Sequence, residues 1–274
     1  MNMSSIRNEV ERAVKEAGRI ILETELDEKL IEKKGSKNFV THVDLEVQKV
    51  LSRSLKEIIP ECSFLREESV SDTLNTNKPT WIIDPVDGTT NLMRDYKWSA
   101  ISVALFVEGK PFVGVVYNPY LNEMFSAQAG EGTYLNNKKV KVTTRSRFEE
   151  CLIAFGTTPY DRTQAHRTFE LAEKIFVDCL EIRRGGAASI DLAYVACGRL
   201  DGFFEMGLQP WDYAAGLLLI QEAGGKITNW ENNNLYNLQP SSILATNGLI
   251  HEHMLSYIRK YSLRKDNKGN NFKI

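Results

Sequence analysis

Two aspartates lie three residues apart at the end of an apolar run, in the segment Trp81-Ile82-Ile83-Asp84-Pro85-Val86-Asp87-Gly88-Thr89-Thr90-Asn91. The apolar residues predict the end of a buried strand, and Pro85 is expected to stop that strand and fix a turn. Two close carboxylates repel each other unless a cation lies between them, and Mg²⁺ prefers oxygen ligands of this kind. The backbone N–H groups of Gly88 and Thr89, at an expected helix start, suit a phosphate. The segment therefore predicts a metal-and-phosphate site.

Three other patches place acidic residues where an apolar run meets a loop or a helix start. Glu67 and Glu68 follow a short apolar stretch, Asp212 precedes a helical run, and Asp44 follows a lysine-containing loop. Each has an ordinary explanation when taken singly: the aspartates as helix caps or turn residues, and the glutamates as solvated side chains. In a layered fold, however, such junctions can meet at one crevice. The residues alone predict metal-assisted phosphate chemistry.

Composition narrows the class of protein. The chain has 274 residues, 42% of them hydrophobic and 26% charged, which is typical of one large or two small globular domains. The net charge of −2 offers no global basic surface for nucleic acid, and no apolar run is long enough to span a membrane. The chain begins in a charged helical pattern rather than a signal peptide, and its four cysteines form no C-x-x-C pair. We expect a cytoplasmic protein with reduced thiols, no membrane partner and no nucleic acid as its main ligand.

Hydrophobic periodicity predicts an α/β protein with an α+β N-terminal half and an α/β C-terminal half. The expected units are residues 1–148, residues 149–264 and a polar tail at 265–274. Residues 32–41 are expected to form a mobile loop. The predicted helices cover residues 4–25, 44–58, 163–177, 188–197, 212–223 and 249–260. The predicted strands cover residues 99–107, 112–117, 122–127, 132–135, 151–155, 200–205 and 242–246.

The motifs resemble those of the inositol monophosphatase family of Mg²⁺-dependent, lithium-sensitive phosphatases. The family pattern D-P-x-D-G-T-T-N is matched at residues 84–91, W-D-x-x-A-G at residues 211–216 and E-A-G-G at residues 222–225. The resemblance extends from the first helix to about residue 255. It implies a layered αβαβα sandwich of the sugar-phosphatase type, a small phosphorylated metabolite as substrate, and a homodimer.

The resemblance also implies ligands for two or three Mg²⁺ ions. Glu67, Asp84 and the backbone carbonyl of Val86 are expected to hold the first ion. Asp84, Asp87 and Asp212 are expected to hold the second, and Glu67 with waters a weaker third. Mn²⁺ is an expected substitute, whereas Li⁺ and Ca²⁺ are expected to inhibit.

Catalytic and substrate-binding roles follow from the same resemblance. A threonine hydroxyl held by an aspartate positions the attacking water in the family, and Thr89 and Asp44 match those positions, with Glu67 as the third catalytic residue. Lys33 matches a lysine on a mobile metal-binding loop. The implied substrate-binding residues are Glu67, Asp87, Gly88, Thr89, Gly186, Ala188, Glu205 and Asp212.

Substrate identity stays open at the level of the sequence. Inositol 1-phosphate is the favoured substrate, but relatives that use fructose 1,6-bisphosphate, 3′-phosphoadenosine 5′-phosphate, NADP or histidinol phosphate share the core motifs. Arg183 and Arg184 are a candidate basic pair for a second phosphate. A regulatory or binding role is a further alternative. Arg66 stands where the family commonly has glycine, and we expect its side chain to point to solvent.

Overall fold

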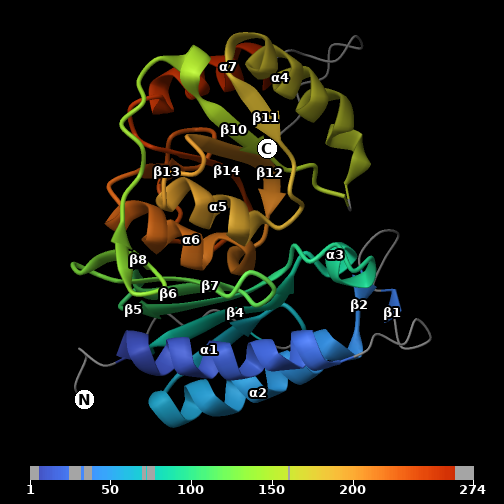
Figure 1. Ribbon diagram of the computed structural model, residues 1–274, viewed down its shortest axis with the longest axis vertical. Helices are drawn as coiled ribbons and strands as arrows, with labels where there is room; N and C mark the ends of the chain where they lie inside the picture. Colours follow the sequence, from blue (N-terminus) through green and yellow to red (C-terminus); the bar gives the residue numbers. More distant parts are fainter. Residues whose placement is uncertain are drawn as a thin grey trace.

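The computed structural model describes residues 6–24, 32–33, 39–69, 72, 78–159 and 161–262. Its helices and strands stack in five layers, in the order helix, sheet, helix, sheet, helix (Figure 1). The helices are α1 Ile6–Glu23, α2 His42–Ile58, α3 Thr89–Met93, α4 Ala165–Asp178, α5 Ala188–Ala196, α6 Pro210–Glu222 and α7 His251–Ser262, with 3₁₀ turns at Phe148–Glu150 and Arg162–Gln164.

Within the described residues the strands form one seven-stranded sheet, one five-stranded sheet and a two-stranded pair. The larger sheet has the strand order β3-β4-β5-β6-β7-β8-β9, and the smaller has the order β11-β10-β12-β14-β13. The strands of the larger sheet are β3 Ser63–Arg66, β4 Thr80–Asp87, β5 Ala100–Val107, β6 Lys110–Asn118, β7 Glu123–Gln128, β8 Gly132–Leu135 and β9 Lys138–Val140. The others are β10 Leu152–Phe155, β11 Glu181–Arg183, β12 Gly202–Leu208, β13 Lys226–Thr228 and β14 Ser241–Thr246, with β1 Glu32–Lys33 and β2 Phe39–Val40 as the pair.

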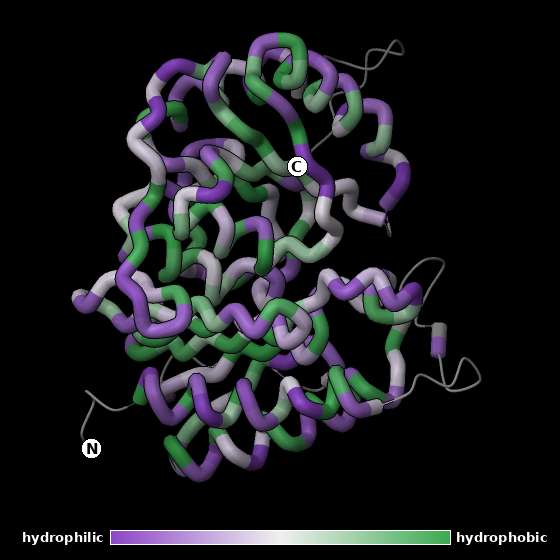
Figure 2. Tube along the Cα trace, viewed as in Figure 1, coloured by the Kyte–Doolittle hydropathy of each residue, from purple (hydrophilic) through white to green (hydrophobic). Residues whose placement is uncertain are grey.

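The outer helices are amphipathic because each covers one face of one sheet. In α1 the buried residues recur every three or four positions, among them Val10, Val14, Ala17 and Ile21, and they pack with α2 against the larger sheet. Figure 2 shows hydrophobic and hydrophilic residues alternating along α1 and α2, as one-sided burial requires. Helices α4 and α7 cover the far face of the smaller sheet in the same way.

The middle layer is buried on both sides. Helix α6 lies between the two sheets, and every residue from Asp212 to Ile220 is buried. Such a helix has no polar face to present, which explains its continuous apolar sequence. It approaches β6 so closely that a Cβ on Gly114 would lie 2.7 Å from the backbone oxygen of Ala215. The helix therefore ties the C-terminal part of the chain to the N-terminal sheet.

The sequence predicts the long elements correctly, and the layered sandwich is confirmed. Three local expectations differ from the structure. Strand β4 does not stop at Pro85 but continues to Asp87 through an irregularity. The predicted loop at 32–41 contains the pair β1–β2. The short strands β3, β9, β11 and β13 were not predicted, because three or four residues are too few to show a period.

The tail at 265–274 lies outside the described residues, and no described helix is long and apolar enough to cross a bilayer.

Candidate active site

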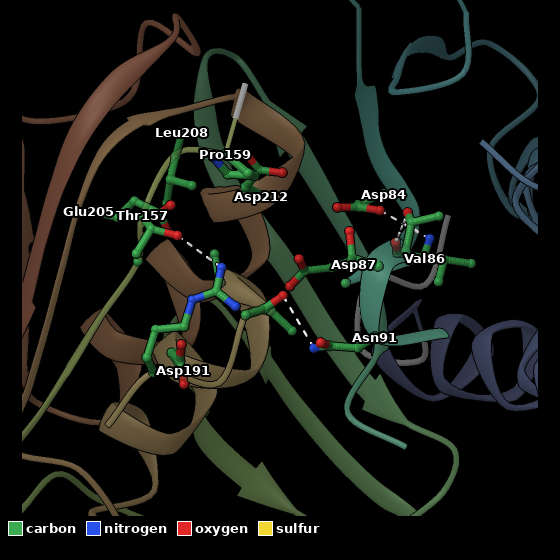
Figure 3. Close-up of a pocket in the computed structure, with 18 of the residues that line it drawn as sticks. Asp84, Val86, Asp87, Asn91, Thr157, Pro159, Asp191, Glu205, Leu208 and Asp212 are labelled. Carbon is green, nitrogen blue, oxygen red and sulfur yellow. Dashed lines mark hydrogen bonds between the residues drawn. The ribbon is translucent and has the colours of Figure 1, made fainter. Parts of the chain in front are cut away.

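One cavity of about 500 Å³ opens between the two sheets, where the C-terminal end of β4 faces the start of α6. Its walls include most of the site residues that the sequence predicts, together with several that it does not (Figure 3). The predicted residues that line it are Glu67, Asp84, Val86, Asp87, Gly88, Thr89, Gly186, Ala188, Glu205 and Asp212. Residues from distant parts of the chain are therefore brought to one place.

A β-bulge aims both aspartates of β4 into the cavity. Asp84 pairs with Ser102 on β5 and Asp87 with Ala100, so β4 advances three residues while β5 advances two. Without the extra residue, strand alternation would send the two carboxylates to opposite faces of the sheet. The backbone N–H of Val86 also donates to Oδ1 of Asp84 at 3.0 Å, which fixes that carboxylate. The proline that was expected to end the strand instead lies within this bulge.

Thr89 and Asp44 form a hydrogen-bonded pair at the edge of the cavity. Oγ1 of Thr89 lies 3.2 Å from Oδ1 of Asp44 and 3.1 Å from the carbonyl oxygen of Val86, so it can donate to either. Oδ2 of Asp44 accepts from the backbone N–H of Thr41 at 2.9 Å and from its hydroxyl at 2.5 Å. Asp44 is thus a capping residue of α2 and the partner of Thr89 at once. The helix-cap explanation and the functional one do not exclude each other.

Glu67 comes to the site directly after β3. Its backbone N–H donates to the carbonyl oxygen of Ile83 at 3.1 Å, which places Glu67 beside the end of β4. The preceding residue, Arg66, does not point freely to solvent as expected. Its guanidinium binds both carboxylate oxygens of Asp72, at 2.7 and 2.8 Å, and lies over the ring of Phe64. Arg66 therefore anchors the chain after β3, and Glu67 rather than Arg66 lines the cavity.

The C-terminal half supplies Asp212 from the first turn of α6. Oδ2 of Asp212 accepts from the backbone N–H of Gln209 at 2.7 Å, a capping contact that orients the carboxylate at the helix start. In Figure 3, Asp212 lies across the cavity from Asp84 and Asp87. The candidate metal ligands thus come from both sides of the cavity.

Ser189 contacts the carboxylate of Asp87, and the sequence did not predict this contact. Its backbone N–H and its hydroxyl both donate to Oδ2 of Asp87, at 2.7 and 2.6 Å. Ser189 lies in the first turn of α5, whose N-cap residue, Ala187, has no side chain that could cap the helix. The carboxylate of Asp87 therefore caps a helix from the other half of the molecule. No local sequence signal links two residues so far apart along the chain.

Glu205 is held on β12 by the chain that follows β10. Its Oε1 accepts from the backbone N–H of Thr158 at 3.0 Å. A Cβ on Gly156 would overlap the Glu205 carboxylate, so only glycine leaves room for it there. Burial raises the pKa of Glu205 to about 7, and the charge of Asp87 adds to this, while hydrogen bonds from the backbone and the nearby Arg184 oppose it.

Two arginines and an aspartate also line the cavity. Arg184 donates from Nη2 to Oγ1 of Thr157 at 3.0 Å, and its guanidinium lies against Gly186, where any side chain would collide with it. Arg162 lines the same wall, whereas the guanidinium of Arg183 bonds its neighbour's carbonyl instead. Asp191 in the first turn of α5 is buried, and desolvation raises its pKa well above the usual range. Only Arg184 of the predicted basic pair reaches the cavity.

The carboxylates of the site destabilise one another's charges. Burial raises the pKa of Asp84 well above its usual range, and the charges of Glu67, Asp87 and Asp212 raise it further. Burial likewise raises the pKa of Asp212, with Asp87 and Glu67 adding to it. No ion pair between described residues reaches Asp84, Asp87 or Asp212. Buried carboxylates that repel one another in this way, with no ion pair to Asp84, Asp87 or Asp212 among the described residues, have the electrostatics of a cation site.

The donor set fits a hard divalent cation. Among the described residues, no three His, Cys, Asp or Glu side chains are placed so that they could hold a metal ion as they stand. The fit rests instead on chemistry: several carboxylates that repel one another converge on one cavity, and all their donors are oxygen.

Of the predicted site residues, Lys33 forms a backbone pair with Phe39, and its side chain lies outside the described structure.

Comparisons with known proteins agree with this geometry. A model of the inositol monophosphatase family matches residues 2–263. Nus factor SuhB of Salmonella typhimurium is 37% identical over 251 residues, which cover 90% of this chain and 93% of that protein. The inositol-1-monophosphatase of Caulobacter vibrioides is 39% identical over 244 residues, covering 86% of this chain and 93% of that protein. The crystal structure of extragenic suppressor protein suhB from Bartonella henselae has a TM-score of 0.86 at 34% identity and covers 93% of this chain and 99% of that one.

Proposed function

Because the chain belongs to the inositol monophosphatase family, we propose that it is a Mg²⁺-dependent phosphomonoesterase that hydrolyses a small polyol phosphate, with inositol 1-phosphate as the favoured substrate. One observation carries the proposal. Glu67, Asp84, Asp87 and Asp212 line one cavity beside the Thr89–Asp44 pair, although these residues come from four separate stretches of sequence. Phosphate monoesters hydrolyse extremely slowly in water. Such a site would position the attacking water and stabilise the negative charge that develops in the transition state.

Three sets of protein oxygens would hold the metal ions. Glu67, Asp84 and the carbonyl of Val86 would hold the first, and Asp84, Asp87 and Asp212 the second. Glu67 with waters would hold a weaker third. Bound Mg²⁺ would lower the pKa of a water and neutralise charge on the phosphate. Mn²⁺ is the expected substitute, and Li⁺ and Ca²⁺ are the expected inhibitors.

Thr89 would orient the attacking water. A hydroxyl donates one hydrogen and accepts at its lone pairs, so Thr89 can accept from a water while it donates to Asp44. Burial raises the pKa of Asp44, but hydrogen bonds from Thr41 and Thr89 oppose that rise and favour the accepting carboxylate. Asp44 therefore acts on the reaction through Thr89.

The remaining cavity residues would bind the substrate. The N–H groups of Gly88 and Thr89 would bind phosphate oxygens close to Glu67. Glu205, Asp87 and Asp212 would accept hydrogen bonds from polyol hydroxyls, alongside the backbone of Gly186 and Ala188. The name of the Caulobacter relative supports inositol 1-phosphate as the substrate. A homodimer in solution, carried over from the family, is part of the same proposal.

Two observations favour further candidates. Arg162 and Arg184 on the cavity wall would suit a substrate with a second anionic group, such as fructose 1,6-bisphosphate or 3′-phosphoadenosine 5′-phosphate. The name of the Salmonella relative, Nus factor SuhB, favours a regulatory role beside catalysis. A regulatory role would survive loss of phosphatase activity, whereas turnover of a bisphosphate would not.

A phosphate-release panel tests the proposal. Inositol 1-phosphate, fructose 1,6-bisphosphate, 3′-phosphoadenosine 5′-phosphate, NADP and histidinol phosphate are each supplied with Mg²⁺, with EDTA, and with increasing Li⁺. We expect the highest kcat/KM for inositol 1-phosphate, no turnover in EDTA, and inhibition by Li⁺. Preference for a bisphosphate would replace inositol 1-phosphate as the proposed substrate. No turnover of any of these substrates would refute the proposed phosphatase activity.

A further inference from the structure

Ser189 holds the carboxylate that faces the cavity from the end of β4. Its hydroxyl and its backbone N–H converge on the same oxygen, Oδ2 of Asp87, at 2.6 and 2.7 Å. Ser189 is fully buried, and Asp87 is 9% exposed, so water competes little for these bonds. Because both donors of Ser189 take Oδ2, the other oxygen of Asp87 is left for different partners.

The neighbours of Asp87 push its carboxylate away. Four other acids line the same cavity as Asp87, and like charges repel one another, so each of them opposes the position of the Asp87 carboxylate: Asp84, Asp191, Glu205 and Asp212. The hydrogen bonds from α5 act in the opposite direction. A carboxylate in this position would turn away from its neighbours if the donors on α5 were weakened.

We infer that Ser189 is a positioning residue for the proposed Mg²⁺ site, which sets the affinity of the ion held at Asp87 by fixing that carboxylate from the other half of the molecule. The inference rests on the proposed function. It goes beyond that function because Ser189 does not line the cavity and reaches it only through the carboxylate of Asp87. Outer partners of metal-binding carboxylates typically change metal affinity about 10- to 100-fold when they are lost.

Substitution of the hydroxyl separates this role from packing. Ser189→Ala removes one of the two donors and retains the backbone N–H. Ser189→Cys keeps nearly the same volume but offers a weak donor. Ser126→Ala is the matched control, because Ser126 is also a buried serine, but its hydroxyl accepts from Arg7 rather than donating to a site carboxylate.

Isothermal titration with Mg²⁺ alone measures affinity, and phosphate release at increasing Mg²⁺ measures the half-saturating concentration. We expect Ser189→Ala and Ser189→Cys to weaken Mg²⁺ binding about tenfold or more, with kcat at saturating Mg²⁺ within about twofold of the wild type. Ser126→Ala should match the wild type in both.

The outcomes that overturn the inference differ from those that overturn the proposed function. Mg²⁺ affinity within twofold of the wild type in both Ser189 variants would refute the positioning role alone. A loss of kcat that saturating Mg²⁺ does not restore would also refute it, because Ser189 would then act elsewhere. A wild-type protein that binds no Mg²⁺ would refute the proposed function and this inference together.

Discussion

Asp84 is a buried carboxylate that is repelled by three other acids of the site. We expect Asp84→Asn to lose nearly all phosphate release, because the variant removes the central carboxylate of the site. The same change should stabilise the metal-free protein, because it relieves a buried charge that Glu67, Asp87 and Asp212 all repel. Each kcal/mol of relief would raise the unfolding temperature by about 2–4 °C. Thermal unfolding in EDTA and a turnover assay measure the two effects.

The control for this prediction is Asp95→Asn. The side chain of Asp95 is 81% exposed and lies 3.9 Å from Lys97, so its charge has little effect on the free energy of unfolding. We expect it to leave both activity and unfolding temperature unchanged. Wild-type turnover by Asp84→Asn would refute the role of Asp84. A lower unfolding temperature in EDTA would refute the argument from repulsion.

Thr89 is expected to act on the chemical step rather than on binding. Thr89→Ala removes the hydroxyl that bonds Asp44, so kcat should fall far more than KM changes. Thr89→Ser keeps that hydroxyl and should retain most of the activity. Thr90→Ala, at a neighbouring position that also lines the cavity, serves as the comparison. Steady-state kinetics decide the matter: a rise in KM alone would make Thr89 a substrate-binding residue.

For single residues, the sequence predicts the residue types, and the resemblance predicts the Thr89–Asp44 pair, but neither predicts the partners of Asp87 and Arg66. The motif around Asp84 and Asp87 predicts a cation-and-phosphate site, because two close carboxylates repel each other unless a cation lies between them. Ser189 and Arg162 were not predicted as members of the site, because their positions depend on contacts between elements that are distant along the chain. The prediction that Arg66 points to solvent was wrong. Its partner, Asp72, lies in a stretch whose sequence has no hydrophobic period from which its position could be predicted.

Among the elements, α7 carries a buried histidine that should make stability depend on pH. His251 at its start lies between Oγ1 of Thr228 and Oγ1 of Thr246, each at 3.0 Å. Burial lowers the pKa of His251 to about 4. The unfolded chain binds a proton below about pH 6.5 and the folded protein only below about pH 4, so stability falls as the pH drops through this window. The loss at pH 5 should be about 2 kcal/mol.

Chemical denaturation at pH 7.5 and pH 5 measures this effect. We expect His251→Gln to be less stable than the wild type at pH 7.5 but to lose about 2 kcal/mol less on acidification, since glutamine does not titrate. His253→Gln changes an exposed histidine of the same helix and should follow the wild type. An identical response of the wild type and His251→Gln to pH would contradict the prediction.

Element length decides what the sequence could predict. Helices such as α1 and α4 repeat their apolar positions over several turns, so their periods are clear. The bulge in β4 is a single extra residue, and nothing in the pattern around Pro85 distinguishes it from a strand end. It nevertheless determines the site, because it brings Asp84 and Asp87 to the same face.

At the scale of the whole molecule, the site lies between two sheets that belong to different stretches of the chain. Glu67 follows β3, and Asp84 and Asp87 lie in β4 of the larger sheet, while Asp212 and Ser189 come from the helices of the middle layer. The resemblance to a family predicted the five layers, whereas periodicity alone could not show that β11 and β13 extend the smaller sheet. The relative position of the two sheets depends on long-range packing around α6, which leaves no local signal.

A cation held from both sides should therefore stabilise the whole protein rather than one half. At a Mg²⁺ concentration about 100 times Kd, binding adds about 2.7 kcal/mol to stability, which corresponds to an unfolding temperature about 5–10 °C higher. Asp212→Asn removes the carboxylate that α6 contributes, so we expect a clearly smaller shift in that variant. Calorimetry with Mg²⁺, against NaCl of equal ionic strength, measures it. An equal shift in NaCl would indicate general screening, and a full shift in Asp212→Asn would remove α6 from the cation site.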